Sequence, residues 1–302
     1  MKLIQVRGNT FCIDTGMTAI PIYKINDEEI IMLDTGWVKE REGIENLLEE
    51  NSLRIVGIIN SHAHIDHIGN NDCFKKKYNC LIAMSAFEAL LCSSTVTLKT
   101  YYSSQTLSEV EKHFGHMVCD TDIMIEDNQN KIYVCGIKFK IFHTPGHSPA
   151  HICIITPDNV AYLGDALISY EVMEGAKMPY AFILREDLKS KEKLYDLKCT
   201  KYIVAHKGIY SDQDITKLIT DNLNFYKQRA AKIYSLIEEA MTLEDITKAV
   251  LKSFNISIGS ISRYAVIERM LRSYVEYLNE SGMISLKMEK GFLKYSKGNT
   301  DL

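Results

Sequence analysis

Four side chains that can bind a metal ion lie within six positions of the sequence. In the segment His62-Ala-His64-Ile-Asp66-His67, three imidazoles and a carboxylate follow one another on an expected loop. Two imidazoles two positions apart on an extended loop can bind one metal ion together, and the Asp-His pair after them can reach a second. Neither helix packing nor strand packing explains this density of ligand groups. The segment therefore indicates a metal site.

Three further candidate ligands each come just after an expected strand. They are His147 after the strand 137–142, Asp165 after the strand 160–163, and His206 after the strand 201–205. Before His147, Pro145 fixes φ and Gly146 permits a tight bend, so the turn can aim the imidazole. Strand ends at one edge of a sheet converge in space, so these ligands can meet the first four. Five imidazoles and two carboxylates suit zinc, with iron or manganese as alternatives.

The elements that must position these residues are read from the hydrophobic pattern. A helix is expected at 39–50, and the weakly patterned segment 93–128, with a helix near 107–114, predicts a lid or binding loop. Strands are expected at 19–25, 29–34, 54–60, 80–84, 131–135, 137–142, 152–156, 160–163 and 201–205.

The chain changes character after residue 211. Helical patterns follow at 214–240 (one or two helices), 242–254 and 260–279, and Thr242 with Asp245 predicts an N-terminal capping box for the second. A hairpin is expected over 284–295. Three helices closed by a hairpin predict a small winged-helix-like domain at 211–302, after a catalytic domain at 1–210.

Composition narrows the function classes. The net charge of −4 provides no bulk attraction to nucleic acid or anionic lipid. The first residues lack the apolar core of a secretory signal, and no apolar run is long enough to cross a bilayer. Eight cysteines without a Cys-x-x-Cys pair favour buried, reduced thiols. We therefore expect a cytoplasmic protein with no membrane association.

The candidate ligands carry a resemblance to a known family. The segments His62-Ala-His64-Ile-Asp66-His67, His143-Thr-Pro-Gly-His147, Leu163-Gly-Asp165 and Ala205-His206 resemble, in this order, the signature of the metallo-β-lactamase superfamily. Leu33-Asp34-Thr-Gly36 resembles another segment of it, and the likeness spans residues 1 to about 210. It implies a mixed α/β (α+β) fold, an αββα sandwich with the metals at one edge.

The resemblance also implies roles for individual residues. His62, His64 and His147 would bind a first zinc ion, and Asp66, His67 and His206 a second. Asp165 would bridge the two ions, and Asp66 and Asp165 are the candidate catalytic residues. Asp34 would orient ligands from behind, and so would His151, for which an ordinary structural role is an equal alternative. Two Zn²⁺ ions per chain would hold a bridging hydroxide at neutral pH.

Several substrate classes stay open. The leading hypothesis is hydrolysis of a small ester, thioester or lactone, similar to glyoxalase II. A phosphodiesterase or endoribonuclease similar to RNase Z is the first alternative. Redox chemistry is disfavoured because the diiron flavoproteins of this fold have Glu at the position of His64, and β-lactam hydrolysis because β-lactamases have Cys or Ser at that of Asp165. The third hypothesis is a winged-helix nucleic-acid-binding regulator with a metal-sensing domain.

The C-terminal region and the long insertion bear on this choice. Residues 211–302 contain thirteen Lys or Arg and twelve Asp or Glu, which is a poor balance for phosphate-backbone binding. A nucleic-acid partner is therefore not favoured, and the helices there would shape the substrate cleft or form a homodimer contact. The weak candidates for contact with a small-molecule substrate are Lys99, Tyr101, Tyr102, Tyr170 and Tyr180.

Overall fold

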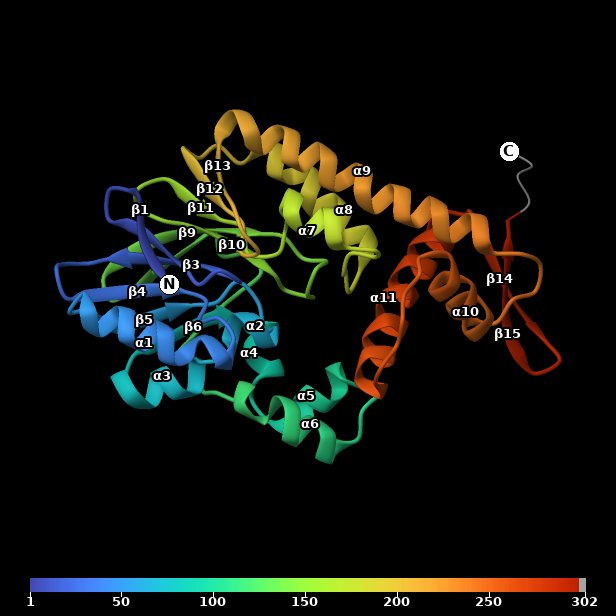
Figure 1. The fold of residues 1–302 in the computed structure, drawn as a ribbon, viewed down its shortest axis with the longest axis horizontal. Coiled ribbons are helices and arrows are strands. Elements are labelled where there is room, and N and C mark those ends of the chain that lie inside the picture. The colour runs from blue at the N-terminus through green and yellow to red at the C-terminus, as the bar shows by residue number, and fades with distance from the viewer. Residues whose placement is uncertain (299–302) are drawn as a thin grey trace.

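Two β-sheets lie face to face in the computed structural model, which describes residues 1–298 (Figure 1). The first sheet contains seven strands in sequence order. Neighbours are antiparallel from β1 to β4 and parallel from β4 to β7. Its strands are β1 (Lys2–Arg7), β2 (Thr10–Asp14), β3 (Ala19–Lys24), β4 (Glu29–Leu33), β5 (Arg54–Ile59), β6 (Leu81–Ser85) and β7 (Ile123–Ile125).

The second sheet has six strands in the order β13-β12-β11-β10-β9-β8. All neighbours are antiparallel except the parallel pair β11 and β12. As a result, β9, β11 and β12 point the same way and end at one edge. The strands are β8 (Lys131–Val134), β9 (Ile137–His143), β10 (Ile152–Ile155), β11 (Val160–Tyr162), β12 (Lys201–Ile203) and β13 (Ile209–Ser211).

Helices cover the outer faces of both sheets. Ile31 and Ile59 of the first sheet pack against Phe139 and Ile154 of the second in the layer between them. This is the expected αββα sandwich. The helices before residue 211 are α1 (Arg41–Glu50), α2 (Ile65–Ile68), α3 (Asn71–Tyr78), α4 (Ala86–Leu91), α5 (Thr95–Tyr101), α6 (Leu107–Phe114), α7 (Tyr170–Gly175) and α8 (Leu184–Lys193), with 3₁₀ turns at Val38–Glu40, Gly115–Met117 and Leu194–Asp196.

The C-terminal region has the predicted element order. One long helix, α9 (Asp212–Leu236), stands where one or two were expected, and α10 (Leu243–Ser253) begins at the predicted capping box of Thr242 and Asp245. The remaining elements are α11 (Ile261–Glu280) and the hairpin of β14 (Ile284–Glu289) and β15 (Phe292–Lys297).

The predicted boundary at residue 210 does not interrupt the packing. Tyr202 of β12, Ile215 of α9 and Tyr274 of α11 belong to one hydrophobic cluster. The Tyr274 hydroxyl donates a hydrogen bond to the carbonyl of Pro179 at 3.0 Å. The C-terminal helices are therefore continuous with the sandwich in packing, and the two-domain division with a winged-helix-like second part stays a prediction.

The eight cysteines are all free thiols, and six of them are buried. Cys135 departs from the expectation of a buried position because it lies at the turn between β8 and β9, where its φ is 49° and its side chain is exposed. Among residues 1–298 no helix has the length and apolarity needed to span a membrane.

Candidate metal centre

The seven predicted ligand side chains gather at one edge of the sandwich. They come from the loop after β5 and from α2, and from the ends of the parallel-pointing strands β9, β11 and β12. Within each of two groups the ligand atoms lie within 4.8 Å of one another. The groups are His62, His64, His147 and Asp165, and Asp66, His67, Asp165 and His206. They have the same members as the two sets implied by the resemblance.

In the first group, three imidazole nitrogens converge on one point. His64 Nδ1 lies 2.8 Å from His62 Nε2 and 3.1 Å from His147 Nε2. One carboxylate oxygen, Asp165 Oδ2, lies 3.2 Å from His147 Nε2. Three nitrogens and one oxygen around a single point form a donor set suited to zinc.

The second group is held together by two carboxylates. Asp66 Oδ2 lies 3.1 Å from His206 Nε2 and 3.7 Å from His67 Nε2. Asp165 Oδ1 lies 3.5 Å from each of the same two nitrogens. Asp165 therefore faces the first group with one oxygen and the second with the other.

Three atoms of these ligand side chains are buried and have no hydrogen-bond partner among the described residues. They are His147 Nδ1, His67 Nε2 and Asp165 Oδ1, and the last two face into the second group. A buried polar atom without a partner calls for an explanation, and an ion is one of the usual ones. The residues present therefore fit a bound cation.

Charge states differ between the two groups. Burial lowers the pKa of His62 and His147 well below the usual range, so these imidazoles are neutral and keep a free lone pair. The carboxylate of Asp165 raises the pKa of His206 to about 10. Burial opposes ionisation of Asp165, but His206 and His67 hold its pKa well below the ordinary value. Metal ions bind neutral imidazoles and ionised carboxylates, so His206 would have to release its proton when a metal ion binds.

Asp34 lies behind the cluster, as the resemblance implies. It is at a positive φ of 65° just after β4, and its Oδ2 accepts hydrogen bonds from His67 Nδ1 at 2.7 Å and from Ser61 Oγ at 2.6 Å. The Tyr162 hydroxyl donates to the same oxygen at 2.7 Å. Since Nδ1 of His67 carries the donated proton, its Nε2 is left free to face the ligand group.

His151 also has a role behind the site. Its Nε2 accepts a hydrogen bond from the backbone N–H of Asp165 at 3.1 Å, and its Nδ1 donates to Thr144 Oγ1 at 2.8 Å. A Cβ atom at Gly164 would lie 2.6 Å from His151 Nε2. Glycine at 164 therefore allows this contact, which fixes the backbone that carries Asp165.

Sequence reasoning missed Glu88, a fully buried carboxylate of α4. It accepts hydrogen bonds from the backbone N–H of Ala63 at 3.0 Å, from Ser148 Oγ at 2.7 Å and from the N–H of Ala150 at 2.9 Å. Ala63 lies between His62 and His64, and Ser148 follows His147. Glu88 therefore ties the two loops of the first group together, and no motif near it in the sequence signalled this.

A cavity of about 330 Å³ opens beside the cluster. Of the five weak candidates for substrate contact, the structure places Tyr101, Tyr102 and Tyr180 in its wall. Lys99 and Tyr170 do not line it: Lys99 Nζ donates to the carbonyl of Ser103, and the Tyr170 hydroxyl donates to Asp221. The wall consists of His64, Ile65, Asp66, Tyr101, Tyr102, Phe114, His147, Asp165, Tyr180, Val266, Arg269 and Met270.

Comparisons with known proteins agree with this geometry. Residues 3–95 match the family model of the metallo-β-lactamase superfamily. A hydroxyacylglutathione hydrolase of Pelagibacter ubique is 27% identical over 186 residues, which cover 58% of this chain and 64% of that protein. These similarities support the metallo-β-lactamase superfamily, and the named relative is a hydrolase.

Solved structures of the superfamily share the fold over nearly the whole chain. A metallo-β-lactamase family protein of Thermus thermophilus has a TM-score of 0.68 and 17% identity, with 93% of each chain covered. A β-lactamase domain protein of Burkholderia ambifaria has a TM-score of 0.73 and 14% identity, with 98% of this chain and 94% of that one covered. The fold shared with these two structures thus extends through α9 to α11.

Tyr101 contacts one of the candidate metal ligands, His64, directly. Its hydroxyl lies 2.9 Å from His64 Nε2 and 2.9 Å from the Tyr180 hydroxyl. Since His64 turns Nδ1 toward the other ligands, its Nε2 carries the proton and donates to Tyr101. Burial raises the pKa of Tyr101 well above its usual value, so the hydroxyl stays neutral.

Tyr101→Phe should lower metal affinity or activity by about 10- to 100-fold, the usual cost of losing an outer partner of a histidine ligand. Competition with a chelator and steady-state kinetics would measure the two quantities. Tyr133→Phe, at an exposed tyrosine of β8, is the control. Unchanged chelator competition and unchanged kinetics would show that the Tyr101 hydroxyl does not orient His64.

Glu88→Ala should lower the free energy of unfolding by about 3 kcal/mol, because three donors lose a charged acceptor in a buried place. The apparent affinity for the first metal equivalent should fall as well, since both ligand loops are released. Glu88→Gln, which keeps one acceptor oxygen, should recover part of the loss. Urea titration is the measurement, with the exposed Glu111→Ala as control; equal stability of the two alanine variants would rule out this role for Glu88.

Proposed function

We propose that this chain is a binuclear zinc hydrolase of a small ester, thioester or lactone. The observation that carries the proposal is the position of Asp165, with one oxygen in each ligand group. A carboxylate in this position can hold two ions at the short separation that two-metal hydrolases use, roughly 3.5–4 Å. The seven proposed ligands are His62, His64, Asp66, His67, His147, Asp165 and His206.

When bound, the two metal ions would supply Lewis acidity and water activated at neutral pH. The protein's own carboxylates would bind and orient the reacting water. Asp66 and Asp165 remain ionised: burial opposes this for Asp66, but His67 holds its pKa near 2. Both line the cavity, so their oxygens can accept hydrogen bonds from the reacting water and fix its direction.

The cavity supports a carbonyl substrate of modest size. Its volume of about 330 Å³ is at the lower end of small-molecule sites, and most of the wall is aromatic or aliphatic. The relative from Pelagibacter ubique is named a hydroxyacylglutathione hydrolase. Together these favour an ester, thioester or lactone over a polynucleotide, whose backbone requires an extended cationic surface.

Elemental analysis with a substrate panel tests the proposal. The panel contains S-lactoylglutathione, an acyl-homoserine lactone, bis(p-nitrophenyl) phosphate, single-stranded RNA and nitrocefin. We expect two zinc ions per chain and turnover of the thioester or the lactone. Full activity with one metal ion per chain would overturn the binuclear site. Turnover confined to the phosphodiesters would overturn the substrate class, and salt-sensitive duplex binding without turnover would favour the regulator.

A further inference from the structure

Helix α11 brings one arginine to the wall of the candidate active site. Arg269 lines the same cavity as His64, Asp66 and Asp165. It lies sixty-three positions beyond His206, the last candidate ligand. The C-terminal region therefore completes the cavity with a cationic side chain that the ligand pattern did not predict.

Arg269 is held over aromatic rings and not by an acid. Its guanidinium lies 4.7 Å from the ring centre of Tyr101 and 5.2 Å from that of Tyr102. Among the described residues no carboxylate pairs with it and no acceptor takes a hydrogen bond from it, although it is half-buried. On the same helix, by contrast, the exposed Arg272 pairs with Glu268 at 3.7 Å.

A positioned guanidinium without an acceptor is suited to an anion from outside the chain. Its planar fork matches the two oxygens of a carboxylate, and stacking on rings leaves that fork free at the edge. Partial exclusion of water strengthens such a pair relative to one at the surface. The wall of this cavity also contains the apolar side chains of Phe114 and Met270, and the ring of Tyr102 lies under the guanidinium.

We propose that Arg269 binds a carboxylate of the substrate and thereby selects esters or thioesters with a terminal carboxylate beyond an apolar spacer. This inference rests on the proposed function, because it names the substrate class of the same site. The reacting carbonyl would lie at the ligand groups, the spacer against the aromatic wall, and the carboxylate at the guanidinium fork.

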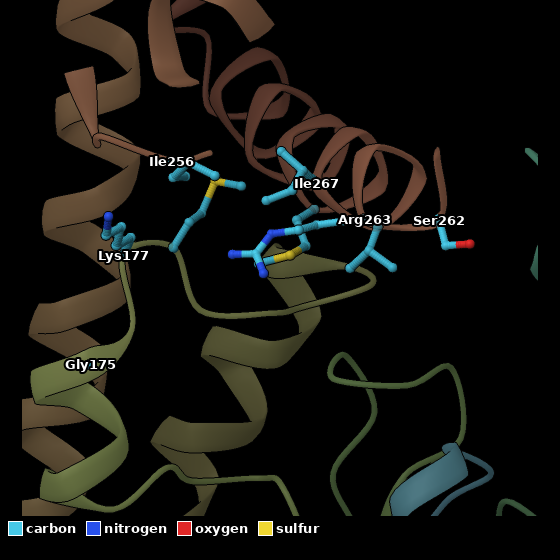
Figure 2. A pocket seen from close by; sticks show the side chains of 9 residues that line it. Gly175, Lys177, Ile256, Ser262, Arg263 and Ile267 are labelled. Carbon is cyan, nitrogen blue, oxygen red and sulfur yellow. The ribbon is translucent and has the colours of Figure 1, made fainter. Parts of the chain in front are cut away.

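A second hollow on the other side of Val266 and Met270 provides the alternative position for the anion. These two side chains line both cavities, and the second has a volume of about 510 Å³. Figure 2 shows Arg263 extending from α11 into this hollow, with Lys177 at its far side. Lys177 Nζ donates to the carbonyl of Asn255, whereas Arg263, like Arg269, has no acid partner among residues 1–298. Arg263 is therefore the main alternative to Arg269 as the residue that binds the anion.

Two matched esters distinguish between an anion site at Arg269 and one at Arg263. Mono-p-nitrophenyl adipate ends in a carboxylate, and p-nitrophenyl hexanoate has the same chain length and ends in a methyl group. The ratio of their kcat/KM values is measured for the metal-loaded wild type and for Arg269→Met, Arg263→Met and Arg272→Met. Metal content is checked in each. The wild type should prefer the adipate by roughly 10- to 100-fold, the effect of one charged hydrogen-bonded pair.

Arg269→Met should bring this ratio close to one, while Arg263→Met and Arg272→Met should keep it. A wild type without preference, or an Arg269→Met enzyme that keeps the preference, would overturn the proposal. Loss of the preference in Arg263→Met alone would assign the anion to the second hollow and would also overturn it.

A binding measurement distinguishes this inference from the proposed function. Calorimetry with adipic acid monoanilide and hexananilide compares the same two chain ends without turnover. Tighter binding of the monoanilide to the wild type but not to Arg269→Met supports the anion site even if neither ester is hydrolysed, a result that would refute the hydrolase alone. Equal binding of the monoanilide to both proteins refutes the anion site, whatever the enzyme hydrolyses.

Discussion

Asp165→Ala is expected to abolish hydrolysis and to release at least one metal equivalent per chain. Its two oxygens face the two ligand groups separately, at 3.2 Å from His147 Nε2 and 3.5 Å from His206 Nε2. Removing them takes one donor from each group and one of the three carboxylates around the buried His67, so that only Asp34 and Asp66 remain beside it. A metal ion contributes several kcal/mol to the transition state, and each 1.36 kcal/mol is tenfold in rate, so kcat/KM should fall at least about 10³-fold.

The measurements are elemental analysis and kinetics on the substrate that the panel identifies. Asp127→Ala, at an exposed carboxylate in the turn before β8, is the matched control and should bind the full metal complement. Asp165→Asn keeps the shape but loses the charge, so it should also lose activity. If Asp165→Ala retained two metal ions and normal turnover, the shared ligand would not be Asp165.

Lys191→Met is expected to cost about 3–5 kcal/mol of folding free energy, because it leaves a buried charge without its partner. Lys191 is fully buried in α8 and pairs with Asp187 at 2.6 Å. Its ammonium also lies 4.3 Å from the ring centre of Tyr226 on α9. The start of α8 lies directly against the ligand loop, since a Cβ at Gly146, where φ is +131°, would lie 2.0 Å from the backbone nitrogen of Asp187.

The loss should depend on pH. Burial raises the pKa of Asp187 above its ordinary value, and Lys191 opposes that rise. Without Lys191 the folded-state pKa of Asp187 rises further, while the unfolded value stays at about 3.9. The variant should thus be least stable, relative to the wild type, above the folded-state pKa, and should regain stability as pH falls toward the unfolded value and the carboxyl is protonated.

Urea titrations at pH 5 and pH 8 would measure this dependence. Lys189→Met, on the exposed face of the same helix, is the control and should change stability little. The double variant Asp187→Leu/Lys191→Met removes both charges and should recover part of the loss. A single variant as stable as the control at both pH values would show that the pair does not stabilise α8.

Local features were predictable where neighbouring residues decide them. The hairpin between β3 and β4 turns at Asn26, whose side-chain oxygen accepts the N–H groups of Glu28 and Glu29. Helix α10 begins where Thr242 and Asp245 satisfy each other's backbone donors. Each depends on contacts over two or three positions, so short-range chemistry was sufficient.

The gathering of the candidate ligands was also predictable, although it joins four separate segments. His62 to His67 are dense enough to indicate a ligand loop by themselves, and His147, Asp165 and His206 each follow a strand. The ordered set resembles that of the superfamily, and the superfamily and its sandwich fold are confirmed. That the gathered side chains bind two zinc ions stays a prediction, and so does the domain boundary at 210.

The sequence by itself determined which residues could bind a metal ion, because ligand chemistry is a property of residue type and close spacing. The tertiary structure decided which side chains hold and surround them. Glu88 meets Ser148 across 60 positions, and Tyr162 meets Asp34 across 128. Arg269 reaches the cavity only because α11 packs against the sandwich. No local pattern marks such partners, since burial and the crossing of distant segments exist only in the folded chain.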